Sequence, residues 1–391
     1  MSAPARRGFP WWAVAAVVVV VLPATGLLPA DDARTLAERT LPILLFLAAL
    51  TVVAETSAGA GLFDAAAGLA ARVARGRRVV LWLLVVVLAT LSTAVLSLDT
   101  TAVLLTPVVI ALARHTRTSP LPFALAVLAL ANTASLALPV SNLTNLLADH
   151  AIRRAGASFL PLMWAPALVA IVVTVAILAV RDRRHLGGTY EPQKPSPAPD
   201  RTLLLLAAGV TGLMAVGFVA GLPPAPLATG AAVVLLVATR VRRRPWPVPP
   251  SQLVPWRTLV VVLGLFVAVE TAHAHGLGAL LHDLAGDGDG AGELLRLAGV
   301  AALASNGVNN LPAYLALEPA AAGDPLRLAA LLIGTGAGPL LTPWGSLATV
   351  LWWHRCRQVM LDVPARTIVL QGALLAPPVV VLAVLALAAA H

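Results

Sequence analysis

Charged side chains are scarce in this sequence. Only 12% of its 391 residues are Asp, Glu, Lys or Arg, whereas 59% are hydrophobic. Roughly a quarter of the residues of an ordinary soluble domain are charged, so the composition excludes that class of protein. Most of the protein is therefore expected to lie in lipid.

Cysteine is almost absent as well. The single Cys356 excludes a disulfide framework and any zinc site built from several thiolates. We therefore expect no metal site and no bound cofactor.

A nucleotide-binding motif is also missing. Gly-x-Gly runs such as residues 334–336 have no downstream Gly-Lys-Ser/Thr and lie in apolar sequence. We do not expect an enzyme that hydrolyses ATP. Work done by this chain would draw on an ion gradient or the membrane potential, unless a separate ATPase subunit docks.

Long apolar runs fill the sequence instead. Four clear examples cover residues 11–28, 159–180, 203–221 and 368–390. Each is long enough to cross a hydrocarbon core, which takes about 20 apolar residues. The sequence predicts an all-α polytopic membrane protein with about nine complete spans.

The net charge of +9 has a topological explanation. Basic residues gather in clusters at 72–78, 114–117, 181–184 and 240–244, whereas the loops on the other side are acidic. Cytoplasmic loops are enriched in Lys and Arg, so the clusters place the N-terminus in the cytoplasm and the chain in the cell's inner (plasma) membrane. The lipid bilayer is then the partner of the hydrophobic surface, and no nucleic-acid partner is expected.

A polar, Pro-rich stretch divides the chain near its middle. It separates an N-terminal repeat (residues 1–180) from a C-terminal repeat (202–391) and is expected to be a cytoplasmic linker (181–201). Each half contains the same order of elements, as a duplicated transporter would.

Each half is expected to contain a re-entrant hairpin followed by a broken transmembrane helix. The hairpins fall at about 79–115 and 292–320, and the broken helices at about 122–148 and 326–353. Basic clusters flank the first hairpin and acidic residues flank the second. The two halves therefore have opposite orientations, which predicts an inverted-topology repeat.

Polar residues concentrate at these four breaks. Backbone that is not helical at membrane depth must be buried in protein or line a wet cavity, which favours a binding site for a small polar solute or ion. The candidate binding residues are Thr100, Asn132, Ser135, Ser141, Asn142, Asn145, Asn309, Asn310, Thr335, Thr342 and Ser346.

The alternative is that small polar residues merely join packed helices. For a single Ser or Thr the two interpretations are equal. For the Asn pairs a binding role is favoured, because each amide needs several partners away from water.

Asp99 is the first candidate for ion coupling. An ionisable group inside an apolar segment costs about 2.5–3.5 kcal/mol on insertion scales and marks a functional site by default. A protonated or helix-capping Asp is the structural alternative. Glu55 and Glu270 are further ion-coupling candidates, although their places at the ends of spans suit an interfacial role equally well.

Several motifs of the chain resemble those of the ArsB-type arsenite/antimonite efflux permeases of the ion transporter superfamily. That superfamily also holds NhaD-type sodium/proton antiporters and divalent-anion/sodium symporters. The motifs are Thr133-Ala134-Ser135-Leu136, Val140-Ser141-Asn142-Leu143, Asn309-Asn310-Leu311-Pro312, Gly338-Pro339, Thr342-Pro343 and Gly345-Ser346-Leu347-Ala348-Thr349.

The resemblance implies two hairpins, two broken helices and an elevator-like alternation of access. It implies arsenite or antimonite as the small inorganic solute and a proton or other ion as the coupling partner, and it is compatible with a homodimer. Charges of the ArsB-type pattern are replaced here by Asn132, Gly336 and Leu340, and its Asn-Asp by Leu98-Asp99.

Arsenite and antimonite are mostly neutral trihydroxides at neutral pH, so hydroxyls, amides and backbone dipoles suffice to bind them. A carboxylate-type anion is the alternative. It predicts a positive side chain or several free helix N-termini, and no Arg or Lys lies inside the breaks. Sodium/proton antiport is a further alternative within the superfamily.

Overall fold

The computed structural model describes residues 11–191 and 200–391. Within these ranges the regular structure is helical, apart from an isolated bridge between Arg77 and Thr189. Nine helical segments of the described part are long and apolar enough to cross a membrane, and two of them, Arg78–Leu96 and Leu98–His115, are the arms of the first hairpin. The predicted class, an all-α polytopic membrane protein, is therefore confirmed.

The first half of the chain forms the following helices: α1 (Trp11–Ala24), α2 (Ala30–Gly59), α3 (Leu62–Val73), α4 (Arg78–Leu96), α5 (Leu98–Thr100), α6 (Thr106–His115), α7 (Pro120–Thr133), α8 (Leu143–Arg154) and α9 (Phe159–Leu186). The second half forms α10 (Arg201–Val219), α11 (Pro224–Val241), α12 (Pro250–Leu253), α13 (Trp256–Ala274), α14 (Leu277–Ala285), α15 (Ala291–Val308), α16 (Asn310–Ala321), α17 (Pro325–Ala337), α18 (Leu347–Gln358) and α19 (Ala365–Ala390).

The first residues of the predicted linker are helical. α9 continues past Val180 through an Arg-rich turn to Leu186, since Arg and Leu are good helix formers whatever their polarity. Residues 192–199 of the predicted linker lie outside the described residues. The division into repeats at 181–201 stays a prediction.

Both hairpins turn through the same backbone conformation. Ser97, between α4 and α5, has φ 79° and ψ 161°, and Asn309, between α15 and α16, has φ 90° and ψ 154°. Residues with a Cβ rarely adopt this region, at a cost of about 1–3 kcal/mol, and such strain clusters at functional sites. Each side chain accepts a hydrogen bond from a backbone N–H of the helix that follows, which offsets part of the cost.

The two broken helices are interrupted by the same means. α7 passes through a 3₁₀ turn to an extended Leu138, and α17 passes through a 3₁₀ turn to an extended Thr342. Pro139 and Pro343 follow these residues, and a proline disfavours helical backbone in the residue before it. The helices resume at α8 and α18, with Asn142 and Ser346 as N-caps.

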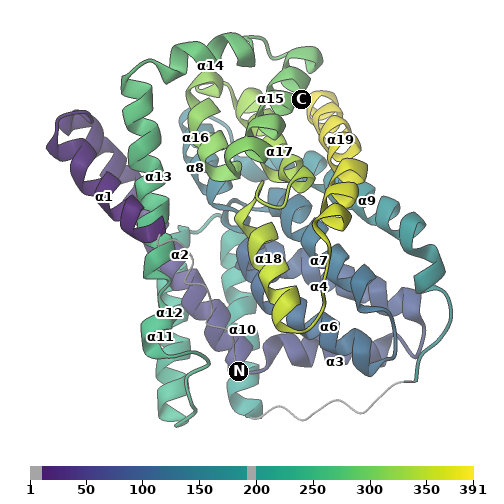
Figure 1. Cartoon of the computed structure of the whole chain (residues 1–391). Coiled ribbons are helices and arrows are strands. Elements are labelled where there is room, and N and C mark those ends of the chain that lie inside the picture. Colours follow the sequence, from purple (N-terminus) through teal and green to yellow (C-terminus); the bar gives the residue numbers. More distant parts are fainter. Residues whose placement is uncertain (1–10, 192–199) are drawn as a thin grey trace, which may run out of the picture.

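The hairpins enter from opposite ends of the molecule. Figure 1 shows α4 and α6 in its lower half and α15 and α16 in its upper half, near the C-terminus. The fold therefore consists of two inverted-topology repeats, each with a re-entrant hairpin and a broken transmembrane helix.

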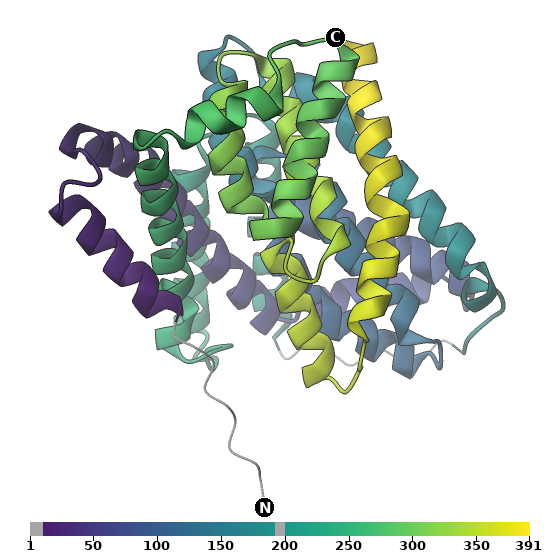
Figure 2. The ribbon, with the colours of Figure 1, turned by 45° about the horizontal axis from the view of Figure 1, so that its top comes forward.

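The helices pack as two groups. α1 lies along α13 and α11 along α2, with α10 and α13 also against α2; we call these five the frame helices. The hairpins, the broken helices, α9 and α19 form the core group, in which α9 packs along α19 and α15 along α17. α1 and α13 lie beside each other at one side of the molecule in both views (Figures 1 and 2). At the centre, every residue of α7 from Pro122 onward is buried.

Candidate functional site

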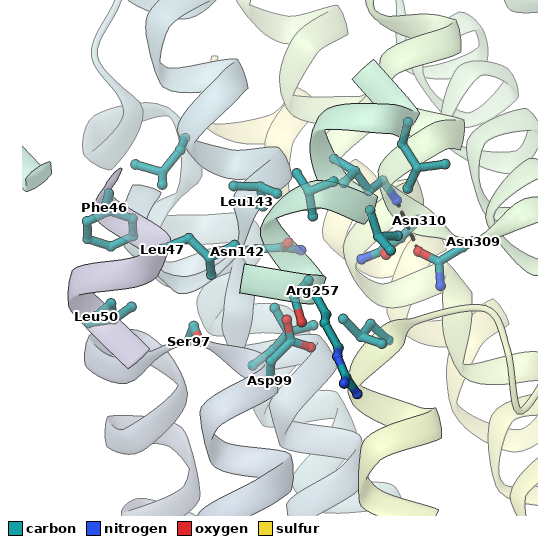
Figure 3. A pocket seen from close by; sticks show the side chains of 18 of the residues that line it. Phe46, Leu47, Leu50, Ser97, Asp99, Asn142, Leu143, Arg257, Asn309 and Asn310 are labelled. Carbon is teal, nitrogen blue, oxygen red and sulfur yellow. Dashed lines mark hydrogen bonds between the residues drawn. The ribbon is translucent and has the colours of Figure 1, made fainter. Parts of the chain in front are cut away.

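A cavity of about 460 Å³ lies where the two hairpin tips approach each other (Figure 3). Ser97 and Asp99 of the first tip, Asn309 and Asn310 of the second, and Asn142 of the first helix break line it. The opposite wall comes from frame helices α1, α2 and α13 and is mostly apolar. The tip cavity thus lies between the core group and the frame.

Two buried polar atoms of the lining residues carry no hydrogen bond within the described part of the chain. They are Oδ1 of Asp99 and Nδ2 of Asn142. Asn142 uses its Oδ1 to accept a bond of 3.4 Å from the N–H of Thr144, which leaves its NH₂ group to donate. An unpaired buried polar group costs about 1–3 kcal/mol, so a conformation that brings a partner to either atom would recover that energy.

The second tip is tied to the second helix break. Asn309 donates from Nδ2 to the carbonyl of Trp344 (3.0 Å), and the backbone N–H of Asn310 donates to the carbonyl of Gly345 (2.9 Å). These bonds fix how the side chains of Asn309 and Asn310 face the cavity (Figure 3).

Asn306 is the main support of this tip and was not among the predicted site residues. Its Nδ2 donates to the carbonyls of Ala302 and Gly338, both at 2.8 Å, and its Oδ1 accepts the N–H of Thr342 at 2.9 Å. The same signal that selected Asn309, an amide inside an apolar helix, would have found it.

Other candidates hold the first break together. Asn145 donates from Nδ2 to the carbonyls of Ser135 (2.6 Å) and Leu138 (3.0 Å). Ser141 donates to the carbonyl of Ala94 in the first hairpin (2.9 Å). These bonds satisfy carbonyls that the broken helix leaves without partners.

Several candidates bond within their own segment and do not line the tip cavity. Asn132 donates to the carbonyl of Leu128 (3.0 Å) and Thr335 to that of Leu331 (2.9 Å). Ser135 donates to the carbonyl of Asn132.

The remaining candidates stabilise turns. Thr100 accepts a bond of 3.3 Å from Ser97, Ser346 caps α18 at the N–H of Thr349, and Thr342 donates to Asn306.

The three acidic candidates lie apart. Asp99 lines the tip cavity, whereas Glu55 lies half-buried on α2 with Arg355 as its charged neighbour. Glu270, on α13, lines a separate cavity together with Arg39 and Glu318. Within the described residues, no group of three or more His, Cys, Asp or Glu side chains could hold a metal ion.

Arg257 is a positive residue of the tip cavity that the sequence analysis missed. It lies near the start of α13, outside the four breaks, and its guanidinium lies 5.2 Å from the ring centroid of Trp256 and 6.0 Å from that of Trp12. Cation–π contacts of this kind hold the charge at the cavity wall. Its position in the sequence gives no sign of the cavity, because the fold brings it in from a frame helix.

Comparison with known proteins agrees with this architecture. The chain is 29% identical over 322 residues to the arsenical pump membrane protein of Escherichia coli, covering 75% of this chain and 73% of that protein. The corresponding protein of Yersinia enterocolitica is also 29% identical, and an uncharacterised transporter of Mycobacterium bovis is 26% identical over 323 residues, covering 78% of this chain and 72% of its own length.

The crystal structure of the Alcanivorax borkumensis YdaH transporter, described as having an unusual topology, has the same fold. The TM-score is 0.52 at 16% sequence identity, with 97% of each chain covered. The family model described as citrate transporter (CitMHS) matches residues 5–333, which is most of the chain. With this match and its polytopic, two-hairpin fold, the protein is a membrane transporter and belongs to the citrate transporter (CitMHS) family.

Proposed function

We propose that this transporter exports arsenite and antimonite through the tip cavity. The observation that carries the proposal is that the cavity is lined by Asp99 and Asn142, each of which has a buried side-chain atom without a hydrogen bond among the described residues, Oδ1 of Asp99 and Nδ2 of Asn142. A neutral trihydroxide presents both O–H donors and oxygen acceptors, so it can bond with both side chains without bringing a net charge into the cavity. The arsenical pump proteins among the relatives support the same solute.

Alternating access would arise from movement of the core group against the frame helices. The tip cavity lies between the two groups, so a displacement of the core would carry the site from one membrane face toward the other. The proton gradient or the membrane potential would drive the cycle, with or without a separate ATPase subunit. Asp99 is the carboxylate that lines the cavity and would carry the coupling proton.

A small carboxylate anion is the second candidate solute. Arg257 supplies the positive side chain that this alternative requires, and the family is described as citrate transporter. The cavity volume of about 460 Å³ lies in the range of small-molecule sites and does not discriminate between the two solutes.

Resistance assays test the first solute. Expression in an arsenite-sensitive host that lacks its own efflux system is expected to raise resistance to arsenite and antimonite but not to arsenate. Unchanged sensitivity with verified membrane insertion, together with transport of a carboxylate, would favour the second candidate.

The variant Arg257→Gln distinguishes between the two candidate solutes by its effect on the apparent KM. For a neutral solute the loss of the charge is expected to change the apparent KM by less than about threefold. For an anion the loss of a charge-assisted contact is expected to raise it by tenfold or more. Arg34→Gln is the matched control, since Arg34 is exposed and pairs with Glu38 on its own helix.

A further inference from the structure

A second cavity separates the frame from the core group. Its volume is about 660 Å³, and its walls come from frame helices α2 and α13 and from α8 and α16 of the core. On α2 it is lined by Thr35 and Arg39, while the tip cavity begins at Phe46, seven residues and about 10 Å further along the helix. Both cavities therefore lie along the same boundary between the two groups.

An ion pair crosses this boundary. Arg39 of α2 donates from Nη2 to Oε1 of Glu318 on α16, and the buried hydroxyl of Tyr314 donates to the same oxygen at 3.2 Å. Only 30% of the Arg39 side chain and 10% of the Glu318 side chain are exposed. Among the ion pairs of the described residues, this one joins a frame helix to the core group.

Arg39 also has a second carboxylate within electrostatic reach. Glu270 of α13 lines the same cavity, interacts with the charge of Arg39, and makes no hydrogen bond within the described part of the chain. The Nε of Arg39 is buried and likewise has no hydrogen-bond partner there. The guanidinium therefore has an unused donor, and a frame carboxylate near it has an unused acceptor.

We propose that Arg39 changes its ion-pair partner when the core moves against the frame. We call Arg39, Glu318 and Glu270 together the latch. In the conformation described here Arg39 holds Glu318 of the core, and when the core moves it passes to Glu270, which stays with Arg39 on the frame. Removing one partner from a buried ion pair leaves an uncompensated charge at a high cost, so a second carboxylate lowers the barrier to separation. The inference rests on the proposed movement of the core but not on the identity of the solute.

Other charged groups face the same cavity. They are His150 and Arg154 of α8 and His273 of α13, while Asp32 of α2 does not line the cavity but lies within electrostatic reach of Glu270. His273 donates from Nε2 to the carbonyl of Leu315 (3.2 Å), and no ion pair joins any of the four to Arg39 or Glu318 in the described structure. The proposed exchange of partners therefore involves three residues: Arg39, Glu318 and Glu270.

The latch can be tested by distance measurements on the whole protein without any solute. Spin labels would be attached to cysteines at Thr35 and Ala322, which lie on the frame and core walls of the cavity, in a Cys356→Ala background. Glu318→Gln is expected to lower the ratio of the described conformation to its alternatives by about tenfold, whereas Arg39→Gln removes the ion pair from both conformations and is expected to shift the ratio less than either carboxylate variant. Glu270→Gln is expected to raise that ratio, because Arg39 then keeps only its core partner.

Arg34→Gln serves as the control and is expected to leave the ratio unchanged. The exchanged pair Arg39→Glu with Glu318→Arg is expected to restore the parental ratio at least in part. The proposal is overturned if Glu318→Gln matches the control, or if Glu270→Gln shifts the ratio in the same direction as Glu318→Gln. Because the readout uses empty protein, a failure to transport arsenite would leave the test intact.

Discussion

Asp99 combines three features that matter for coupling. It follows a strained turn at a hairpin tip, it lines the cavity between core and frame, and its Oδ1 is buried without a partner among the described residues. For these reasons we expect the Asp99 carboxyl to be the group that gains and loses the coupling proton. No other carboxylate of the described chain lines the tip cavity.

We expect Asp99→Asn to insert and fold but to lose proton-driven accumulation. Asn keeps the size and hydrogen-bonding capacity of Asp and removes the titrating group, so exchange of solute without net energy input should survive. Uptake into everted vesicles at several external pH values measures both activities.

Asp64→Asn is the matched control for this variant, because Asp64 is exposed on α3 and far in sequence from the tips. It should transport like the parent. If Asp99→Asn keeps the parental rate and pH dependence, the proton is carried by Glu55 or Glu270, or coupling uses no proton.

The sequence selects candidate residues by their chemistry and says little about how their side chains are directed. Asp99, Asn142, Asn309 and Asn310 were predicted and line one cavity. Asn132 was predicted on the same grounds, yet its amide donates to its own helix. The direction of a side chain at a helix break depends on the turn that precedes it, and composition does not encode that turn.

Asn306 of the second hairpin is hydrogen-bonded to the second broken helix and holds the two elements together. We expect Asn306→Ala to lower stability by about 2–4 kcal/mol, since it leaves the carbonyl of Gly338 and the N–H of Thr342 without their partner. Thermal unfolding of the purified protein in detergent measures the change.

Asn132→Ala is the comparison for Asn306→Ala, because its amide makes one bond inside its own helix. Its cost should be about 1 kcal/mol. Equal losses in the two variants would mean that the link between hairpin and break contributes little.

Two frame helices are joined by a charged contact outside the membrane-spanning segments. Asp200 caps α10 and accepts bonds from Arg242 (2.9 Å) and Arg244 (3.1 Å) beyond α11. The pKa of the Asp200 carboxyl is held well below its ordinary value. The main cause is the hydrogen bond from Arg242, followed by the bond from the N–H of Leu203 and the bond from Arg244.

A carboxyl whose pKa is lower in the folded state stabilises the protein above its unfolded pKa. That stabilisation is expected to be lost progressively as the pH falls below about 4, where the unfolded chain takes up a proton first. Asp200→Asn should lower the melting temperature at pH 7 and flatten its dependence on pH below that range. A variant with the parental acid profile would show that the contact does not contribute.

At the scale of the whole molecule, the placement of charges predicts the order and orientation of the hairpins. The contacts between distant helices depend on packing and are not predicted by it. Basic and acidic flanks predicted two inverted hairpins because each flank reflects a local preference for one side of the membrane. The division into frame and core, the place of Arg257 in the tip cavity and the pairing of Arg39 with Glu318 depend on contacts between distant segments. No local pattern in the sequence contains them.

The orientation of the whole molecule is the last expectation to test. The basic clusters place the N-terminus and the linker in the cytoplasm and the C-terminus outside. In the structure the exposed Glu191 and Asp289 belong to loops at opposite ends of the molecule (Figure 1). In a Cys356→Ala background, a membrane-impermeant maleimide should label Asp289→Cys in intact cells and Glu191→Cys only after permeabilisation. The reverse pattern would invert the topology, and it would then place the cavity of Arg39 and Glu318 on the cytoplasmic side of the membrane.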